Sequence, residues 1–128
     1  MLGKTGGLRV TIELYGIPNC DTVKKARAWL EARGIVYRFH DYKKEGVDTA
    51  RLASWASERG WALLLNTRGT TFRKLPEHDK TGIDGPKALA LMAANPSLIK
   101  RPVVEHDAAS GGGLLIGFEP DRWAQLFG

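Results

Sequence analysis

The sequence predicts an α/β protein built on one mixed, four-stranded sheet. The chain begins with the pattern of a strand, a helix and a strand, and it ends with two short strand-like runs followed by a helix. Strands connected through a helix pair in parallel with a right-handed crossover, whereas strands connected by a tight turn pair antiparallel. Because both connections occur, the sheet is expected to be mixed. At 128 residues the chain has the length of one domain.

The strand–helix–strand unit comes first. Residues 10–15 alternate and are rich in β-forming side chains, which predicts a buried strand. The helix that follows is amphipathic and is expected to end at Gly34. Its apolar positions recur at helical spacing and are Val23, Ala26, Trp29 and Leu30. Residues 35–42 alternate again and predict the second strand, with Val36 and Phe39 expected in the core.

The middle of the chain is predicted to be helical. Residues 48–58 form an amphipathic pattern for which Asp48 is a suitable N-cap. Residues 66–75 are polar and interrupted by glycine, so they are expected to stay outside the core. A further helix is expected to begin at Asp84, with Pro86 in its first turn.

Two strands and a helix are expected at the end. Residues 100–105 and 114–118 predict a hairpin whose turn lies at residues 111–113. Residues 119–127 predict a closing helix with Trp123 on its apolar side. This order of elements is the outline of the thioredoxin or glutaredoxin fold, with a helical insertion between its two halves.

Composition excludes several classes of protein. The chain is 43% hydrophobic and 26% charged, as soluble globular domains are. No apolar run could span a membrane and residues 1–9 lack a signal-peptide core, so a cytoplasmic location without a membrane partner is expected. Residues 1–9 are expected to be a flexible leader and residues 10–128 a single domain. The net charge of +5 comes from scattered basic residues, so direct nucleic-acid binding is not expected.

Cys20 is the only cysteine, which excludes an internal disulfide and the paired spacings of zinc sites, and no metal site is expected. It lies where the first helix begins, and the unpaired N–H groups and dipole of a helix start favour a thiolate. A reactive thiol is predicted, the alternative being a small buried apolar residue. Asn19 suits a helix start and is also a candidate substrate contact. Lys24, one turn later, either stabilises the thiolate or is a solvated surface lysine.

Four motifs carry a resemblance to a known family. They are YGIPNCDTVKKAR at residues 15–27, NTRGTTFRKL at 66–75, PSLIKRPVV at 96–104 and LIGF at 115–118. Because the four motifs occur in the family's order, the chain resembles the arsenate reductase-like (ArsC/Spx) family. It is most similar to the single-cysteine YffB-like branch of that family.

The resemblance implies roles for particular residues. Cys20 takes the place of the nucleophile, and Arg101 that of an arginine that holds an anionic substrate. Pro102 matches a proline that is cis in this fold, beside which the backbone can bind a peptide-like ligand such as glutathione. Arg68 matches a second arginine, although a solvated loop position is an equal alternative. Arg101 could also be a structural arginine at a sheet edge.

Two departures from the family pattern weaken the expectation of arsenate reduction. The family's histidine before the cysteine is replaced by Gly16, and an arginine of the last strand by Gly117. Loss of these cations is expected to raise the thiol's pKa and to loosen the grip on an oxyanion. Val23 occupies the position of the second cysteine of a Cys-x-x-Cys redox pair, so redox sensing of the Spx kind is a poor match.

Three functional hypotheses follow. The first is a glutathione-dependent thiol reductase that uses Cys20 on a small oxidised or disulfide substrate, with glutathione as co-substrate, no bound cofactor and glutaredoxin as a further partner. The second is a Spx-like protein that binds RNA polymerase without catalysis. The third is a catalytically quiet protein that still binds glutathione. The three histidines share no spacing with Cys20 and are expected to serve structure or surface.

Overall fold

The computed structural model describes residues 10–108 and 112–128. The elements in chain order are β1 (Ile12–Gly16), α2 (Asp21–Ala32), β2 (Arg38–Asp41), α3 (Tyr42–Glu45), α4 (Thr49–Arg59), α5 (Trp61–Leu64), α6 (Thr70–Arg73), α7 (Glu77–Lys80), α8 (Gly85–Ala94), the 3-10 helix Pro96–Leu98, β3 (Val103–His106), β4 (Gly113–Ile116) and α9 (Pro120–Phe127). The expected leader at residues 1–9 and part of the expected turn at residues 111–113 lie outside the described residues.

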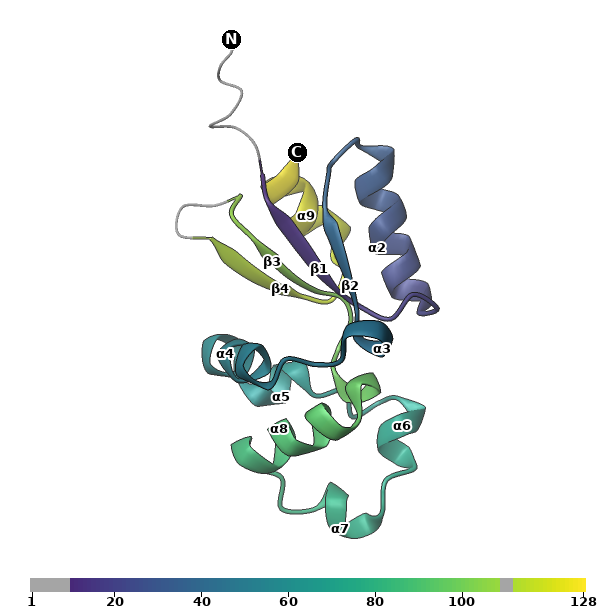
Figure 1. The fold of residues 1–128 in the computed structure, drawn as a ribbon, viewed down its shortest axis with the longest axis vertical. Helices are drawn as coiled ribbons and strands as arrows, with labels where there is room; N and C mark the ends of the chain where they lie inside the picture. Colours follow the sequence, from purple (N-terminus) through teal and green to yellow (C-terminus); the bar gives the residue numbers. More distant parts are fainter. Residues whose placement is uncertain (1–9, 109–111) are drawn as a thin grey trace.

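The four strands form one sheet in the order β2-β1-β3-β4, which confirms the predicted mixed sheet. β1 pairs in parallel with β2 and antiparallel with β3, and β3 pairs antiparallel with β4. In this register Leu14 lies between Phe39 and Val104. Helices α3 to α8 are inserted between the two halves of the sheet and lie beside it in Figure 1.

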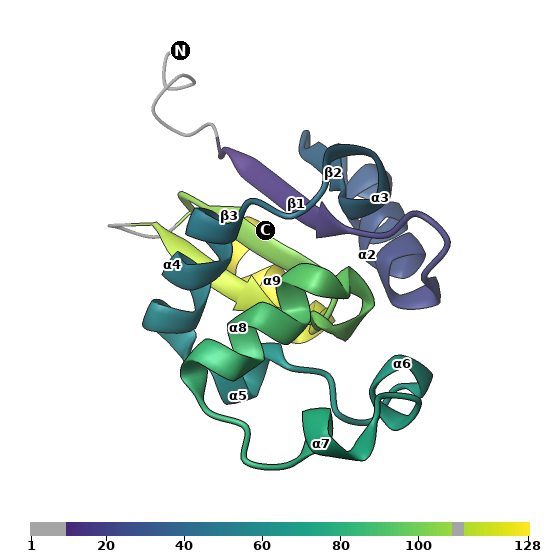
Figure 2. The same ribbon diagram turned by 60° about the horizontal axis from the view of Figure 1, so that its bottom comes forward.

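Helices α2 and α9 pack on one face of the sheet, because alternate residues of each strand point to that side. Ile12 and Leu14 of β1 meet Leu30 of α2 and Trp123 of α9 in one buried cluster, called the α2 cluster below. Figure 2 shows the insertion helices on the other side of the strands, where a second cluster joins Tyr15 to residues of α4, α5 and α8.

Local capping explains where several of these helices begin. The side chain of Asp48 accepts hydrogen bonds from the N–H groups of Ala50 and Arg51 at the start of α4. Asp84 accepts one from Lys87 at the start of α8, where Pro86 lies in the first turn. These contacts confirm both predicted starts, because an Asp cap satisfies N–H groups that have no partner within the helix.

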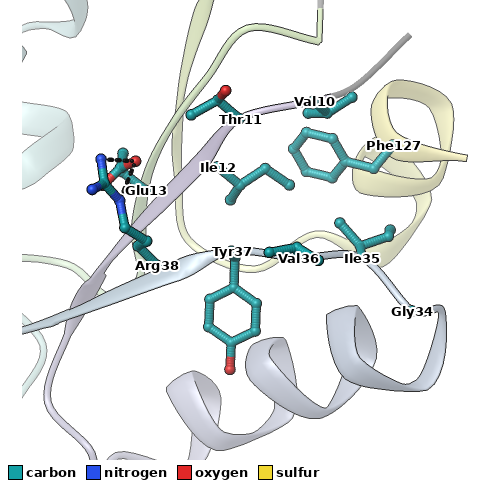
Figure 3. A pocket seen from close by; sticks show the side chains of 10 residues that line it. All are labelled: Val10, Thr11, Ile12, Glu13, Gly34, Ile35, Val36, Tyr37, Arg38 and Phe127. Atoms are coloured by element: carbon teal, nitrogen blue, oxygen red, sulfur yellow. Dashed lines mark hydrogen bonds and ion pairs between the residues drawn. The ribbon is translucent and has the colours of Figure 1, made fainter. Parts of the chain in front are cut away.

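The second strand is shorter than predicted, and the expectation that Val36 is a core residue was wrong. Pairing with β1 begins only at Arg38 opposite Glu13, so the preceding residues have no strand partner. Val36 is 82% exposed. It lies at the mouth of an apolar groove of about 560 Å³, shown in Figure 3, which Phe127 of α9 lines from the other side. Phe39 is partly buried against the α2 cluster, as expected.

The polar segment at residues 66–75 stays outside the core as predicted, since none of its residues is buried. It contains the short helix α6, and its two large apolar residues, Phe72 and Leu75, pack against the second cluster. Two apolar side chains in a polar stretch were sufficient to attach it, since burial depends on individual side chains and not on the mean composition of a segment.

A polar network lies on the insertion side of the sheet. His40 is held between Glu13, at 2.6 Å, and Glu45, at 3.1 Å, and its ring stacks on Tyr15. Arg38 donates two hydrogen bonds from Nε and Nη2 to the other oxygen of Glu13. Burial lowers the pKa of His40, but the hydrogen bonds to Glu13 and Glu45 outweigh burial and raise it above the ordinary value.

The raised pKa of His40 makes stability depend on pH. A group whose pKa is raised by folding contributes stability fully below its unfolded value, about 6.5, and loses that contribution as pH rises through the folded pKa. We therefore expect the difference in unfolding free energy between the wild type and His40→Gln to shrink from about pH 5.5 to about pH 8.5, by on the order of 1 kcal/mol or less because the site is partly exposed. Denaturant titrations at each pH measure the difference.

Glu13→Gln supplies the control, because Glu13 is the nearer of the two carboxylates that hold His40. When His40→Gln is made in the Glu13→Gln background, its effect on stability should change less with pH than in the wild type. An effect of His40→Gln that does not change with pH in the wild type would contradict the assignment of charge to His40.

Candidate active site

Cys20 occupies the N-cap position of α2, immediately before the first helical residue, Asp21. The turn that leads into it from β1 is closed by a hydrogen bond from the Cys20 N–H to the Ile17 carbonyl, 3.2 Å. The Cys20 carbonyl accepts the N–H of Lys24 at 2.9 Å as the first bond of the helix. The side chain is partly buried against the α2 cluster. The backbone therefore holds the thiol at a fixed place beside the free N–H groups of the helix start.

Three groups around the thiol favour its charged form. Burial raises the pKa of Cys20, but the backbone N–H groups of Val23 and Thr22 and the guanidinium of Arg101 stabilise the thiolate. Together they outweigh burial and bring the pKa of Cys20 below its ordinary value. A larger thiolate fraction is what nucleophilic attack by cysteine requires.

Arg101 is held in place by backbone carbonyls. Its Nη1 donates to the Ser97 carbonyl at 2.8 Å and to the Ile99 carbonyl at 3.4 Å. Its Nε is buried without a hydrogen-bond partner among the described residues. Because backbone carbonyls and not an acidic side chain hold the guanidinium, no carboxylate offsets its positive charge beside Cys20.

The peptide bond from Arg101 to Pro102 is cis, as the resemblance implies. Pro102 is buried, and its carbonyl accepts the N–H of Gly117 at 2.8 Å. This bond ties the segment that carries Arg101 to the end of β4. The guanidinium beside Cys20 therefore comes from the far half of the chain and is positioned by the sheet.

The structure brings only some of the predicted site residues together. Cys20 and Arg101 meet, and Pro102 follows Arg101 directly. Asn19 and Lys24 are exposed neighbours of Cys20 along the chain. The Arg68 side chain is exposed and makes no hydrogen bond or ion pair within residues 10–108 and 112–128, while its backbone N–H donates to the Asn66 side chain. Figures 1 and 2 both place α6, which follows Arg68, below the turn that carries Cys20.

Val23 is a site residue that the sequence analysis placed in the core and at the position of a missing redox cysteine, without a role beside the thiol. Its N–H is one of the groups that favour the thiolate, and its side chain packs on Gly16. A Cβ placed on Gly16 would lie 2.8 Å from Val23 Cγ2, which is closer than real contacts allow. The position where the family pattern has a histidine is therefore filled by Val23. The sequence signal that could have indicated this contact is the glycine at position 16, four residues before Cys20, together with the branched side chain of Val23.

The backbone conformation also explains why glycine occupies position 117. Its φ is +87°, in the left-handed region that favours glycine over other residues. An arginine there, as in the family pattern, would be strained in this backbone. Both departures from the pattern are thus built into the geometry around the site.

The described residues offer no candidate for a metal centre, since no three His, Cys, Asp or Glu side chains among them are placed to share an ion. Over the same residues, no helix has both the length and the apolar character needed to cross a bilayer.

The fold defined by this sheet and its insertion is thioredoxin-like, as the solved structures it resembles are. Residues 15–126 match the family described as the ArsC family, and the chain belongs to that family. A structure of a protein called YffB is 48% identical, has a TM-score of 0.84 and covers 91% of this chain and 99% of its own.

Two further relatives show the breadth of the family. The solution structure of an arsenate reductase (ArsC) related protein from Brucella melitensis is 50% identical, with a TM-score of 0.71, over 91% of this chain and 94% of that one. The global transcriptional regulator Spx of Listeria innocua is 32% identical over 87% of this chain and 82% of its own length. The family thus contains both arsenate reductase-related proteins and transcriptional regulators.

Replacing Arg101 should weaken the thiolate. In Arg101→Gln we expect the pKa of Cys20 to rise, because a cation that stabilises the charged form is lost. Arg101→Lys keeps a charge but not the fixed guanidinium, so its pKa should lie between those of the wild type and Arg101→Gln. The ultraviolet absorbance of the thiolate across pH measures each value, with Cys20→Ser as the blank. Arg68→Gln is the control and should match the wild type; an equal rise in both variants would contradict the role of Arg101.

Adding a methyl group at position 16 should destabilise the protein. Gly16→Ala forces Val23 to move, and overpacking of this kind costs about 1–3 kcal/mol. Combining it with Val23→Ala makes room for the methyl, so the double variant should be more stable than the sum of the single changes predicts, with a coupling of about 0.5–3 kcal/mol. Denaturant unfolding of the wild type, the two single variants and the double variant measures this coupling. Strictly additive changes in unfolding free energy would show that the methyl group at position 16 does not clash with Val23.

Proposed function

We propose that this protein is a glutathione-dependent thiol reductase in which Cys20 is the nucleophile. The observation that carries the proposal is the placement of the Arg101 guanidinium beside a cysteine at a helix start, which lowers the pKa of the thiol. A single cysteine has no resolving partner in the same chain. The second thiol must therefore come from another molecule, and glutathione is the abundant thiol of the cytoplasm, where we expect the protein to act.

The reaction proceeds in two exchanges. The Cys20 thiolate attacks one sulfur of a substrate disulfide, a new S–S bond forms to Cys20, and the other sulfur leaves as a thiolate that takes a proton from water. A glutathione thiolate then attacks the mixed disulfide and releases Cys20 as a thiolate. Where the substrate half held on Cys20 is itself glutathione, the product is oxidised glutathione. Over the two exchanges, one glutathione thiol becomes part of a disulfide, one substrate thiol is released, and Cys20 returns to its starting state.

Arg101 stabilises negative charge at Cys20 in both exchanges, since the thiolate is the attacking group in the first and the leaving group in the second. The backbone beside Pro102 is the proposed binding edge for glutathione. Asn19, Lys24 and Arg68 are the proposed contacts for its carboxylates. Glutaredoxin is a further candidate for the second exchange. Arsenate reduction is expected to be weak, because Gly16 and Gly117 supply neither of the cations found in the family pattern.

Substitution of Cys20 tests the proposal. Cys20→Ser should lose glutathione-linked reduction of a small mixed disulfide by at least about 100-fold, since the nucleophile is removed with little change of shape. Incubation with oxidised glutathione should add one glutathione to the wild type, seen by intact mass, and none to Cys20→Ser. Full activity in Cys20→Ser would refute the proposal.

A second candidate is a Spx-like protein that binds RNA polymerase without catalysis. It is favoured by the match to Spx regulators over most of the chain. The two candidates separate in one experiment: capture of polymerase subunits by the wild type and by Cys20→Ser alike supports binding, while absence of polymerase together with a Cys20-dependent glutathione adduct supports the reductase.

A further inference from the structure

Three segments of the chain meet at the end of β1 that leads to the candidate thiol site. β2 runs parallel to β1 and ends opposite Gly16. β3 runs antiparallel to β1 and begins opposite Tyr15. Tyr42 directly follows β2, and Arg101 lies just before β3. Both residues therefore lie at the edge of the sheet from which β1 continues to Cys20, although they are far apart in the sequence.

The Tyr42 side chain is packed among residues that also support Arg101. It is only 4% exposed and belongs to the second cluster together with Leu98 and Ile99. These two residues come from the segment that holds Arg101, since the Ser97 and Ile99 carbonyls accept hydrogen bonds from its Nη1. The phenol ring and the guanidinium are thus supported by the same short segment before β3.

Tyr42 and Arg101 each carry a buried polar atom that is unpaired. The hydroxyl of Tyr42 and the Nε of Arg101 form no hydrogen bond within the part of the chain that the structure describes. Buried polar groups are nearly always hydrogen-bonded, and leaving one unpaired costs free energy. Arginine Nε can only donate a hydrogen bond, whereas a phenol oxygen can also accept one. The two atoms are therefore complementary.

Trp123 Nε1 is the third buried side-chain atom without a partner among the same described residues. It lies in the α2 cluster, on the other face of the sheet, and an indole N–H can only donate. Of the three atoms, only the Tyr42 hydroxyl can therefore accept the Nε–H of Arg101.

Arg101 is the charged group that acts most strongly on the Tyr42 hydroxyl. Burial raises the pKa of Tyr42, and the positive charge of Arg101 opposes that rise because it favours a phenolate. The effect of the Glu105 carboxylate is smaller. Since charge interactions weaken with distance, this order agrees with the placement of Tyr42 and Arg101 at one edge of the sheet.

We propose that Tyr42 is a positioning residue for Arg101, whose Nε–H it accepts at the phenol oxygen. Both hydrogen bonds of the guanidinium to carbonyls are made by Nη1, so rotation about that end can bring Nε to the hydroxyl. A phenol fixes the guanidinium without a negative charge, whereas Arg38 and Arg51 are held by carboxylates that offset theirs. The full charge of Arg101 therefore remains available to the Cys20 thiolate.

The catalytic meaning of this contact rests on the proposed function, whereas the contact itself is a property of the free protein. A guanidinium held in one orientation stabilises negative charge at Cys20 when the thiolate attacks and when it leaves. Without the phenol oxygen, the guanidinium faces Cys20 for a smaller fraction of the time, and the thiolate is less stabilised.

Hydrogen exchange of the wild type tests the contact without any substitution. The side-chain Nε–H of Arg101 should exchange with water at least about tenfold more slowly than that of the exposed Arg68, because it is buried and hydrogen-bonded. NMR of the nitrogen-15-labelled protein measures both rates, with Arg101→Gln and Arg68→Gln to assign the two resonances. An Arg101 Nε–H that exchanges as fast as that of Arg68 would contradict the proposal.

Tyr42→Phe removes the phenol oxygen and keeps the ring. The Arg101 Nε–H should exchange faster than in the wild type. At about pH 7, Cys20 should react with iodoacetamide at least about threefold more slowly, a loss within the range of couplings between residues of one hydrogen-bond network. The pH profile of this reaction should move to higher pH, because the thiolate is less stabilised.

The effect of Tyr42 on Cys20 should pass through Arg101. In an Arg101→Gln background, adding Tyr42→Phe should leave the pH profile of Cys20 unchanged, because the residue that Tyr42 positions is gone. A merely structural role of the hydroxyl would instead lower the unfolding free energy and leave the pH profile of Cys20 unchanged in both backgrounds.

Tyr15→Phe is the matched control. Tyr15 is a buried tyrosine of the same cluster, and its hydroxyl donates to Glu105 at 3.0 Å on the insertion side of the sheet. This variant should react at Cys20 as the wild type does, even where its unfolding free energy is lower. The proposal is overturned if Tyr42→Phe reacts as the wild type does, if Tyr15→Phe shows the same loss, or if the loss persists in the Arg101→Gln background.

Failure of the proposed function gives a different result from failure of this inference. A protein that takes up no glutathione but loses Cys20 reactivity in Tyr42→Phe refutes the reductase and leaves the contact standing. A Cys20-dependent glutathione adduct, with equal Cys20 reactivity in Tyr42→Phe and the wild type, refutes the positioning role and leaves the reductase standing.

Discussion

The pairing of β1 with a strand on each side fixes the geometry of the thiol site and of the polar network on the opposite face. Hydrogen bonds to β2 and β3 set the register of β1, and the register decides which of its side chains point to each face. Leu14 points to the α2 cluster, whereas Glu13 and Tyr15 point to the polar network. The end of the same strand leads through Gly16 into the turn that carries Cys20. A slip of one residue would exchange the two faces and move the thiol.

The two faces of the sheet differ in how their cations are held. The thiol site receives Arg101 from the segment before β3, a cation anchored on carbonyl groups and not on an acid. On the insertion side, Arg51 and Arg38 instead pair with the carboxylates of Glu105 and Glu13. The Arg101 cation is therefore available to the Cys20 thiolate, whereas the cations of the other face are already paired.

Family membership explains the scaffold of the thiol site but not its particular chemistry. The thioredoxin-like sheet, the cysteine at the helix start and the arginine before a cis proline fit the ArsC family. In contrast, a side chain at position 16 would collide with Val23, and one at position 117 would be strained by the positive φ of that residue. The site has kept a stabilised thiolate while it has fewer cations for an oxyanion.

The sequence by itself determined the order of the four strands and of helices α2, α4, α8 and α9, the helix starts at Asp48 and Asp84, and the place of Cys20 before α2. Periodicity, capping and helix-start electrostatics act over a few neighbouring residues, so these features can be predicted locally. Arg101 and Pro102 could be assigned only through the family resemblance. Tertiary structure alone decided that Val36 is exposed, since β1 offers it no partner, and that Val23 fills the space above Gly16. It also decided that Glu105 meets Arg51 and that the buried Tyr42 hydroxyl has no hydrogen-bond partner among residues 10–108 and 112–128. A sequence pattern shows which residues tend to be buried, but contacts between distant segments depend on register and packing in three dimensions.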